Sequence, residues 1–253
     1  MKIACSIQAR MNSERLPGKV MMEVGGQPLL GHQIDRLKQC KSLSEIIVAT
    51  TTTEVDDNIE DLCLKKGVSV FRGSEVDVLG RVASAIDDFN VDVHVESFGD
   101  SPLVDPQIVD QFVEIYLNAE NANTIVTNTL TRSYPAGLEV NVYSGKALCD
   151  LNVKMAISDP LREHVGFNLM QYASEKNLIN ISAPKALSFP DLYLEVDEAP
   201  DFQVISDIIE HFGKALPTAK ASQIIRYAHN QKGLLLANKN IYRRWKTLRA
   251  GHV

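Results

Sequence analysis

Residues 3–19 read IACSIQARMNSERLPGK and join a short apolar run to a basic loop. The apolar run, Ile3 to Ile7, has the length and composition of a buried strand. The loop after it carries Arg10, Arg15 and Lys19 together with a proline and a glycine. Open α/β sheets bind ligands outside the carboxyl ends of their strands, and arginine keeps its charge there. The stretch therefore predicts a loop that binds a phosphate group.

The charge of this loop suits a nucleoside triphosphate. At an effective dielectric near 20, each close pair of opposite charges is worth about 4 kcal/mol before desolvation, so three cations can hold a highly charged anion. Gly18 permits close backbone approach, and Pro17 stiffens the loop. The alternative is a solvated loop with incidental charges. The patterns GxxxxGK[ST] and GxGxxG are both absent from the sequence.

Strand-like and helix-like segments alternate through about residue 127. The expected strands are residues 3–7, 45–51, 68–71 and 91–95, and the expected helices are residues 28–40, 55–66, 78–89 and one that Asp105 caps, with Pro106 in its first turn. This alternation predicts an α/β fold with a largely parallel sheet, right-handed crossovers and flanking helices.

The regular alternation of strands and helices ends near residue 127. We expect residues 128–168 to form a small inserted lid or subdomain with a strand at 138–143. A strand at 192–196 should return the chain to the main sheet, covered by helices near 200–212 and 218–229. Residues 1–230 are then one domain and 231–253 a C-terminal tail, of which the basic part from Lys239 to Val253 is expected to pack on a partner chain.

Composition narrows the function classes. The 253 residues carry a net charge of -6, which argues against a nucleic-acid-binding surface. The four cysteines are scattered without zinc spacing, which favours reduced thiols. The first apolar stretch is too short for a signal peptide, and no later run approaches a membrane span, so we expect a cytoplasmic protein without membrane contact.

Two aspartates at predicted strand ends are candidate metal ligands. Asp100 lies in FGDSP, and Asp197 follows the strand expected at 192–196. Magnesium prefers one or two carboxylates together with phosphate oxygens, so these residues and the basic loop predict a metal–triphosphate site. The alternative for Asp100 is an ordinary Gly-Asp-Ser-Pro turn.

Seven segments of the sequence resemble the sugar cytidylyltransferases, and the resemblance covers roughly residues 2–212. In chain order they are IQARMNSERLPGKVM, IIVATT, VFRGSEVDVL, GDSPLVDP, YPAGLEV, REHV and VDEAPDF. The chain looks most similar to the spore-coat polysaccharide biosynthesis branch and more distantly to the 3-deoxy-manno-octulosonate and N-acylneuraminate cytidylyltransferases. The resemblance implies a Rossmann-like nucleotide-diphospho-sugar transferase fold, a mostly parallel mixed sheet and a homodimer.

The resemblance also implies an activity: CMP transfer from CTP to an acidic sugar or related acid, with release of pyrophosphate and Mg²⁺ as cofactor. Arg10, Ser13, Arg15 and Lys19 would hold the triphosphate, and Ala9 and the segment Arg72, Gly73, Ser74 would lie near the cytosine. Asp100 and Asp197 would bind the metal. Arg10, Lys19 and Asp100 would carry the catalysis.

The acceptor is expected beside the inserted segment. The residues implied there are Arg132, Tyr134, Glu139, Arg162, Glu163 and His164, with arginine suited to bind a carboxylate or phosphate in bidentate fashion. The segment after Asn128 or the stretch from Tyr242 to Leu248 would form the dimer contact.

Three positions depart from the family pattern: Glu96 where arginine is common, Phe98 where a polar residue is common, and Gly80 where aspartate is usual before Arg81. They leave the acceptor open. They also support a second hypothesis, that the protein is a nucleotide-binding regulator that has lost catalytic activity. A third hypothesis is a glycosyltransferase, whose DxD-type metal motif residues 195–197 only loosely imitate.

Overall fold

Seven strands form one sheet in the order β5-β4-β1-β6-β8-β7-β9 in the computed structural model, which describes residues 1–243. The strands are β1 (Ile3–Gln8), β4 (Glu45–Thr51), β5 (Ser69–Gly73), β6 (Val93–Phe98), β7 (Ile125–Thr127), β8 (Asn141–Ser144) and β9 (Leu178–Asn180). Strands β5, β4, β1 and β6 are parallel, and β8 runs antiparallel to both of its neighbours. The predicted mostly parallel mixed sheet is confirmed. A separate hairpin pairs β2 (Glu23–Val24) with β3 (Gln27–Pro28).

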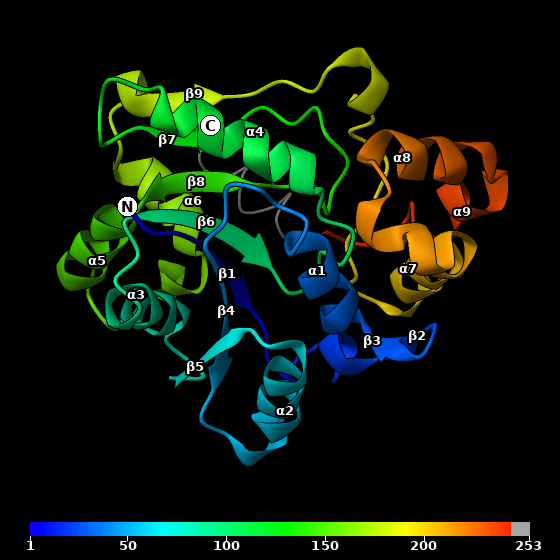
Figure 1. Cartoon of the computed structure of the whole chain (residues 1–253), viewed down its shortest axis with the longest axis horizontal. Helices are drawn as coiled ribbons and strands as arrows, with labels where there is room; N and C mark the ends of the chain where they lie inside the picture. The colour runs from blue at the N-terminus through cyan, green and yellow to red at the C-terminus, as the bar shows by residue number, and fades with distance from the viewer. Residues whose placement is uncertain (244–253) are drawn as a thin grey trace.

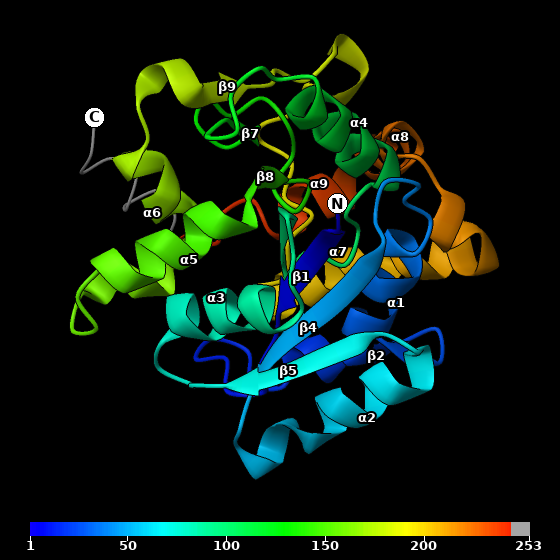
Figure 2. The same ribbon diagram turned by 60° about the vertical axis from the view of Figure 1, so that its left-hand side comes forward.

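Helices cover both faces of the sheet (Figures 1 and 2). One face packs against α1 (Leu29–Leu37), α2 (Asp57–Lys66), α4 (Pro106–Leu117), α7 (Ala199–Phe212) and α8 (Ala221–Asn230), and the other against α3 (Val78–Asp88), α5 (Gly145–Lys154) and α6 (Val165–Tyr172). A further helix is α9 (Lys232–Ala237), and the 3-10 turns are η1 (Lys19–Met21), η2 (Glu54–Asp56), η3 (Pro160–Glu163), η4 (Glu175–Asn177), η5 (Lys185–Leu187) and η6 (Gly213–Thr218). Within residues 1–243, no helix has the length and apolar character needed to cross a bilayer.

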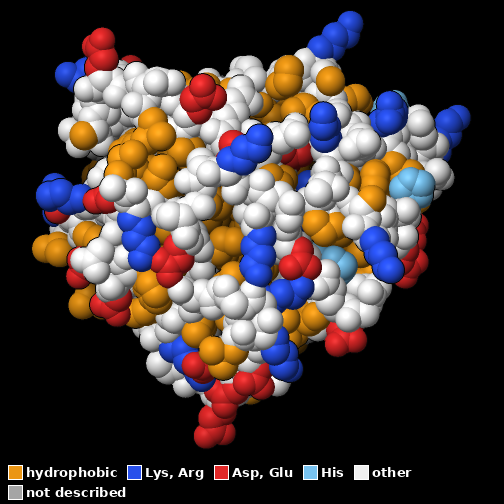
Figure 3. Space-filling model, in the orientation of Figure 1, with side chains coloured by type: hydrophobic (Ala, Val, Ile, Leu, Met, Phe, Trp, Pro, Cys, Tyr) orange, Lys and Arg blue, Asp and Glu red, His pale blue; other side chains and the backbone are white. Residues whose placement is uncertain are grey.

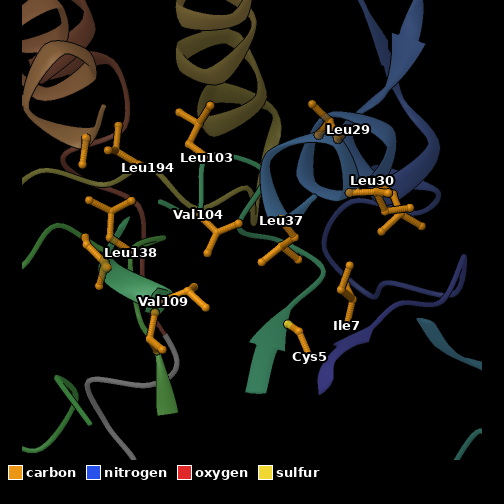
Figure 4. Packing of buried hydrophobic residues seen from close by; sticks show 14 of the residues in the cluster. Cys5, Ile7, Leu29, Leu30, Leu37, Leu103, Val104, Val109, Leu138 and Leu194 are labelled. Atoms are coloured by element: carbon orange, nitrogen blue, oxygen red, sulfur yellow. The ribbon is translucent and has the colours of Figure 1, made fainter. Parts of the chain in front are cut away.

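The larger core lies between the sheet and the α1 side. Leu30 and Leu37 of α1 lie with Cys5 and Ile7 of β1 in this cluster, and Figure 4 shows them close together. Full burial of such a side chain contributes about 1.5–3 kcal/mol. The core therefore fixes β1 rigidly, and with it the start of the basic loop.

On the outside of the molecule, basic and acidic side chains are interspersed over the face that Figure 3 shows.

Most predicted elements of the first half are present. The strand expected at 45–51 is β4, and Asp105 caps α4 by accepting hydrogen bonds from the amides of Gln107 and Ile108. The strand expected at 192–196 is wrong. These residues form no named strand: they make an isolated bridge with Ala136, and the amide of Val196 donates to Asp100 O.

Residues 128–168 contribute to the main body of the fold. They supply β8 to the centre of the sheet, and α5 packs on α3 in the second core. The polar, turn-rich composition of the first residues suggested a separate insertion, but the alternating stretch after them pairs with β6 and β7. A role for this segment as a lid or dimer contact stays a prediction.

The predicted tail packs in part on its own chain. Helix α9 lies within it, and the buried Arg243 forms an ion pair with Asp201, Nη2 to Oδ1, at 2.6 Å. Arg15 also donates to the backbone oxygen of Tyr242. Of the dimer contact predicted at 242–248, residues 244–248 lie outside the described residues.

A buried histidine in β6 predicts acid sensitivity. Burial lowers the pKa of His94 to about 3, and its Nε2 lies 2.7 Å from Ser6 Oγ. Below pH 6.5 the unfolded chain binds a proton that the folded chain does not, so the free energy of unfolding should fall by about 1.4 kcal/mol per pH unit until pH 3. Urea unfolding at pH 7 and pH 4.5 measures this loss.

The matched control is the double variant Ser6→Ala, His94→Phe, which removes the titrating ring and its partner together. Its loss of stability between the two pH values should be smaller than that of the parent by about 3 kcal/mol. An equal loss in both proteins would contradict the assignment to His94.

Candidate functional site

The basic loop is held in place by a buried carboxylate and a left-handed glycine. Asp56, 1% exposed, accepts a hydrogen bond from the amide of Met11 and others from Thr50 and Thr51 at the end of β4. Gly18 has φ 72°, a conformation that costs other residues strain, and its amide donates to Met11 O. The loop is thereby closed on itself and tied to the neighbouring strand.

The predicted charged residues meet at one point. Lys19 Nζ lies 3.1 Å from Asp197 Oδ1 and 3.6 Å from Asp100 Oδ2, and it donates to the backbone oxygen of Val196 at 2.6 Å. Arg15 Nη2 lies 2.8 Å from Asp197 Oδ2. The structure thus brings together residues from three segments that are far apart in the sequence. We call Arg15, Lys19, Asp100 and Asp197 the central cluster.

Different elements supply the two aspartates. Asp100 follows β6, where a Cβ on Gly99 would lie 2.4 Å from Gln8 O, so only glycine lets this loop pass so close to β1. Asp197 precedes α7, and its amide donates to Asp201 at the first turn of that helix. Asp201 is buried and also pairs with Arg243.

The charges of the central cluster shift its carboxyl groups in opposite directions. Burial raises the pKa of Asp100, Lys19 opposes this rise, and the negative charge of Asp197 adds to it. Burial alone would raise the pKa of Asp197, but Lys19 and Arg15 outweigh burial and lower it. Asp197 is therefore the more firmly ionised of the two carboxylates.

A cavity of about 240 Å³ lies over the basic loop, and we call it the nucleotide cavity. Five residues predicted to bind nucleotide line it: Ala9, Arg10, Ser13, Arg15 and Lys19. Both predicted metal ligands line it as well. Arg10 Nη1 donates to Glu75 O, and its Nη2 lies 3.9 Å from Glu163 Oε1. The triphosphate-binding residues predicted from the sequence thus share one cavity.

A second cavity, of about 350 Å³, adjoins the first, and we call it the acceptor cavity. The two cavities share Gln8, Arg15, Phe98, Asp100, Glu163 and Asp197. Of the predicted acceptor residues, Glu139, Glu163 and His164 line it. Burial raises the pKa of Glu139 and lowers that of His164. The central cluster therefore lies at the boundary between the two cavities.

Three predicted nucleotide residues lie elsewhere. Arg72 pairs with Asp57 and Glu60 of α2 and donates to two backbone oxygens, and it does not line the nucleotide cavity. Gly73 and Ser74 line a third cavity, of about 460 Å³. The predicted position of this segment near the cytosine stays a prediction.

Three predicted acceptor residues lie outside the acceptor cavity. Tyr134 is buried against Phe112, and its hydroxyl has no hydrogen-bond partner among residues 1–243. Arg132 pairs with Glu139 at 3.1 Å. Arg162 is buried and holds both oxygens of Asp77, each at 2.8 Å. Each arginine is engaged with a carboxylate of its own chain.

Glu96 lines the acceptor cavity and connects the elements around it through hydrogen bonds. It is 1% exposed and accepts hydrogen bonds from Gln8, Asn141, Tyr143 and the amide of Gly166. A Cβ on Gly166 would lie 1.9 Å from Glu96 Oε2, so glycine is required for this contact. Burial raises the pKa of Glu96 and the hydrogen bonds oppose the shift. Glu96 thus joins the start of α6 to the sheet.

Sequence reasoning overlooked Arg81 as a site residue. It lines the nucleotide cavity and the third cavity, is 3% exposed, and its Nε has no hydrogen-bond partner among residues 1–243. Burial lowers its pKa to about 10, and Arg10 adds to this effect. The signal was present, because Arg81 interrupts the apolar face formed by Val78, Val82 and Ala85.

The central cluster suits a divalent cation. Its oxygens are hard ligands of the kind that Mg²⁺ prefers, and the Lys19 ammonium already lies between the two carboxylates as a positive charge. Among residues 1–243, no group of three or more acidic, histidine or cysteine side chains is arranged to hold a metal. A metal held by Asp100 and Asp197 would therefore need ligands beyond the protein, and phosphate oxygens are ligands of the kind that Mg²⁺ prefers.

An α/β sheet with a basic loop after its first strand, one carboxylate after β6 and a second before α7 is the arrangement of a nucleotidyltransferase. The chain belongs to the cytidylyltransferase family, whose model matches residues 4–240. The spore coat polysaccharide biosynthesis protein SpsF of Bacillus subtilis is 31% identical over 223 residues, which cover 87% of this chain and 90% of SpsF. The predicted family is confirmed, and the chain is an enzyme of the nucleotidyltransferase class.

Two solved structures are similar to the whole fold. A cytidylyltransferase from Leptospira borgpetersenii matches with a TM-score of 0.86 and 29% identity over 96% of this chain and 100% of its own. A CMP:2-keto-3-deoxy-manno-octonic acid synthetase complexed with CTP matches with a TM-score of 0.61 and 17% identity, over 83% of this chain and 99% of its own. The latter likeness shows the fold alone. The predicted Rossmann-like fold is confirmed.

Proposed function

We propose that this enzyme transfers CMP from CTP to an oxygen of a sugar or sugar-like acceptor and releases pyrophosphate, with Mg²⁺ held by Asp100 and Asp197. The observation that carries the proposal is the position of the central cluster between the two cavities. A triphosphate in one cavity and an acceptor in the other would meet at these residues. The similarity to SpsF favours a role in surface polysaccharide synthesis. We place the reaction in the cytoplasm, and a homodimer stays a prediction.

The reaction needs little covalent help from the protein. An acceptor oxygen attacks the α-phosphorus, the bond to the oxygen that bridges the α- and β-phosphates breaks, pyrophosphate leaves with the electron pair, and the hydroxyl proton passes to solvent. Arg10, Arg15 and Lys19 would hold the triphosphate and stabilise the charge that develops on it. A bound magnesium ion would polarise the phosphate oxygens. Ser13 and Arg81 would complete the nucleotide cavity.

The family resemblance predicts that the acceptor is an acidic sugar, bound by Arg132, Tyr134, Glu139, Arg162 and His164. Glu139 and His164 line the acceptor cavity, but the two arginines that would bind an acid group are paired with carboxylates. The proposed acceptor is therefore a compound with a reactive oxygen, and an acid group on it stays a prediction.

Calorimetry and pyrophosphate release test the proposal together. CTP should bind at least about 10-fold more tightly with Mg²⁺ than with EDTA, because two carboxylates then share a cation with the phosphates. Pyrophosphate should appear when CTP is combined with a suitable acceptor, and less with ATP, GTP or UTP. CTP binding that is independent of Mg²⁺, without pyrophosphate release from a broad acceptor panel, would favour a nucleotide-binding regulator. Hydrolysis or transfer from a nucleotide sugar instead would favour a glycosyltransferase.

A further inference from the structure

Gln8 is the last residue of β1 and lies where the two cavities meet. Its side chain is half-buried and lines both the nucleotide cavity and the acceptor cavity. Its backbone is held on both sides, because β1 pairs with β4 and β6 and the amide of Gly99 donates to Gln8 O. The side-chain amide of Gln8 therefore leaves the sheet from a fixed point beside the basic loop.

A buried carboxylate decides which way this amide points. Gln8 Nε2 donates to Glu96 Oε1 at 3.0 Å. The two ends of a glutamine amide have nearly the same shape, so the chemistry of the partner decides which end faces it. An ionised carboxylate accepts hydrogen bonds and donates none. The nitrogen of the Gln8 amide therefore faces Glu96, and Gln8 Oε1 is turned away from it.

The surroundings of Glu96 keep it an acceptor. The backbone amide of Gly166 can only donate, and it lies 3.1 Å from Glu96 Oε1. Asn141 donates from Nδ2 at 2.9 Å, and its orientation is fixed because Thr127 Oγ1 donates to Asn141 Oδ1 at 2.6 Å. Burial raises the pKa of Glu96, and these hydrogen bonds to its charged form oppose the rise. The row of hydrogen bonds from Thr127 to Gln8 thus fixes the direction of each amide in it.

Gln8 Oε1 is a neutral hydrogen-bond acceptor at the boundary of the cavities, and it forms no hydrogen bond within residues 1–243. The other residues that both cavities share are Arg15, Phe98, Asp100, Glu163 and Asp197. The arginine carries only donors, and the phenylalanine ring offers no conventional acceptor. The two aspartates are the proposed metal ligands, and the Glu163 side chain is 60% exposed. The amide oxygen of Gln8 is thus free to bind a substrate hydroxyl.

An attacking hydroxyl needs a partner of this kind. Its oxygen must direct a lone pair at the α-phosphorus, so its O–H bond has to point elsewhere. A fixed acceptor beside the hydroxyl holds it in this orientation, and correct orientation of the reacting atoms lowers the barrier substantially. An amide oxygen accepts the hydrogen bond without taking the proton, which passes to solvent as the new bond to phosphorus forms.

We propose that Gln8 is a catalytic residue whose Oε1 accepts a hydrogen bond from the attacking hydroxyl of the acceptor, in the orientation that Glu96 imposes. This inference rests on the proposed CMP transfer, because it assigns the second cavity to the acceptor. Glu96 is then a positioning residue that acts through Gln8. An arginine at position 96, common in the family pattern, has only donors, so Gln8 would have to turn its oxygen toward position 96 and its nitrogen toward the cavities.

The first test replaces the amide. Gln8→Leu keeps the approximate size of the side chain and removes both polar atoms. Pyrophosphate release is measured with CTP, Mg²⁺ and a panel of gluconate, glucuronate, 3-deoxy-manno-octulosonate and glucose. For the best acceptor of the parent enzyme, kcat/KM should fall by about 10- to 100-fold, because the hydroxyl loses its orientation. Calorimetric CTP binding should change by less than about 3-fold.

Gln39→Leu is the matched control, because Gln39 is exposed just after α1 and lies outside both cavities. It should keep the parent values. A folded Gln8→Leu protein that retains more than about a third of the parent kcat/KM for the acceptor, or that loses CTP binding to the same extent, would overturn the role of Gln8 while leaving CMP transfer intact.

A double-mutant cycle tests the role of Glu96. Glu96→Gln keeps the shape of the side chain but can present a donor to Gln8 Oε1, so the Gln8 amide is free to turn round. It should lower kcat/KM for the acceptor by about 10-fold in the parent and by less than about 2-fold in the Gln8→Leu background. Equal losses in the two backgrounds would show that Glu96 does not act through Gln8.

A measurement without turnover separates this inference from the proposed function. If the parent enzyme releases no pyrophosphate with any of the compounds, the proposed transfer fails for them. Isotope-labelled enzyme, loaded with Mg²⁺ and a CTP analogue that cannot be cleaved between the α- and β-phosphates, is then titrated with the same panel and observed by NMR. The side-chain amide signal that is absent from Gln8→Leu should shift with at least one compound. A signal that none of them shifts would overturn the inference.

Discussion

Lys19→Ala is expected to lower the rate of pyrophosphate release from CTP by about 100- to 1,000-fold, the loss typical of removing one donor that stabilises transition-state charge. In the structure Lys19 Nζ lies close to Asp197 and Asp100, which line both cavities, and Lys19 itself lines the nucleotide cavity. When CTP binds, the Lys19 ammonium would pair with phosphate oxygens, and a divalent cation would replace it between the two carboxylates. The substitution removes the contact between the ammonium and the phosphates.

The measurement is steady-state pyrophosphate release at saturating CTP and acceptor. Lys65→Ala is the matched control, because Lys65 is exposed in the last turn of α2, away from both cavities. It should keep the parent rate. A Lys19→Ala protein that is folded by circular dichroism and retains more than about a tenth of the parent rate would show that the lysine only neutralises its aspartate neighbours.

Asp201→Asn is expected to lower the free energy of unfolding by about 3–5 kcal/mol, the usual cost of leaving one member of a buried ion pair without its partner. The Asp201 carboxylate is fully buried and accepts hydrogen bonds from Arg243, Asn238 and the backbone amides of Asp197 and Glu198. An asparagine amide would direct a donor at groups that are themselves donors, and the positive charge of Arg243 would lose its closest carboxylate.

Urea unfolding compares this variant with Asp207→Asn on the same helix. Asp207 is only partly buried and accepts a long 3.4 Å hydrogen bond from Gln203, so its replacement should cost about 0.5 kcal/mol or less. Since Asp201 also fixes the amide of Asp197, the Asp201→Asn protein should bind Mg²⁺–CTP more weakly. Equal stability of the two variants would mean that Arg243 is compensated by Glu195 and Asp197 alone.

Local sequence patterns were sufficient for the parts of the site that lie on one strand and its loop. The apolar run before Gln8 and the three cations after it predict both β1 and the loop, because strand composition and charge density are local properties. The same holds for Asp105, whose capping geometry depends only on the next three residues.

Partners that are distant in the sequence could not be predicted in this way. Arg132 and Arg162 were predicted to bind substrate because free arginines suit acid groups, yet each is bound to a carboxylate that only the fold brings near. Leu192–Val196 has strand composition, but the sheet already has β8 where a further strand would pair with β6. Propensity is a weak guide where pairing is decided by the rest of the sheet.

The contact between Arg243 and Asp201 has a consequence for biosynthesis. Strands β1 and β6 and the basic loop emerge from the ribosome early, but the residue that neutralises the buried carboxylate beneath Asp197 is made more than two hundred residues after the loop. Until it arrives, Asp201 lacks the cation with which it pairs in the folded chain. A nascent chain that stalls before Arg243 would therefore hold the triphosphate loop but an unfinished metal site, and would be a substrate for chaperones rather than a catalyst.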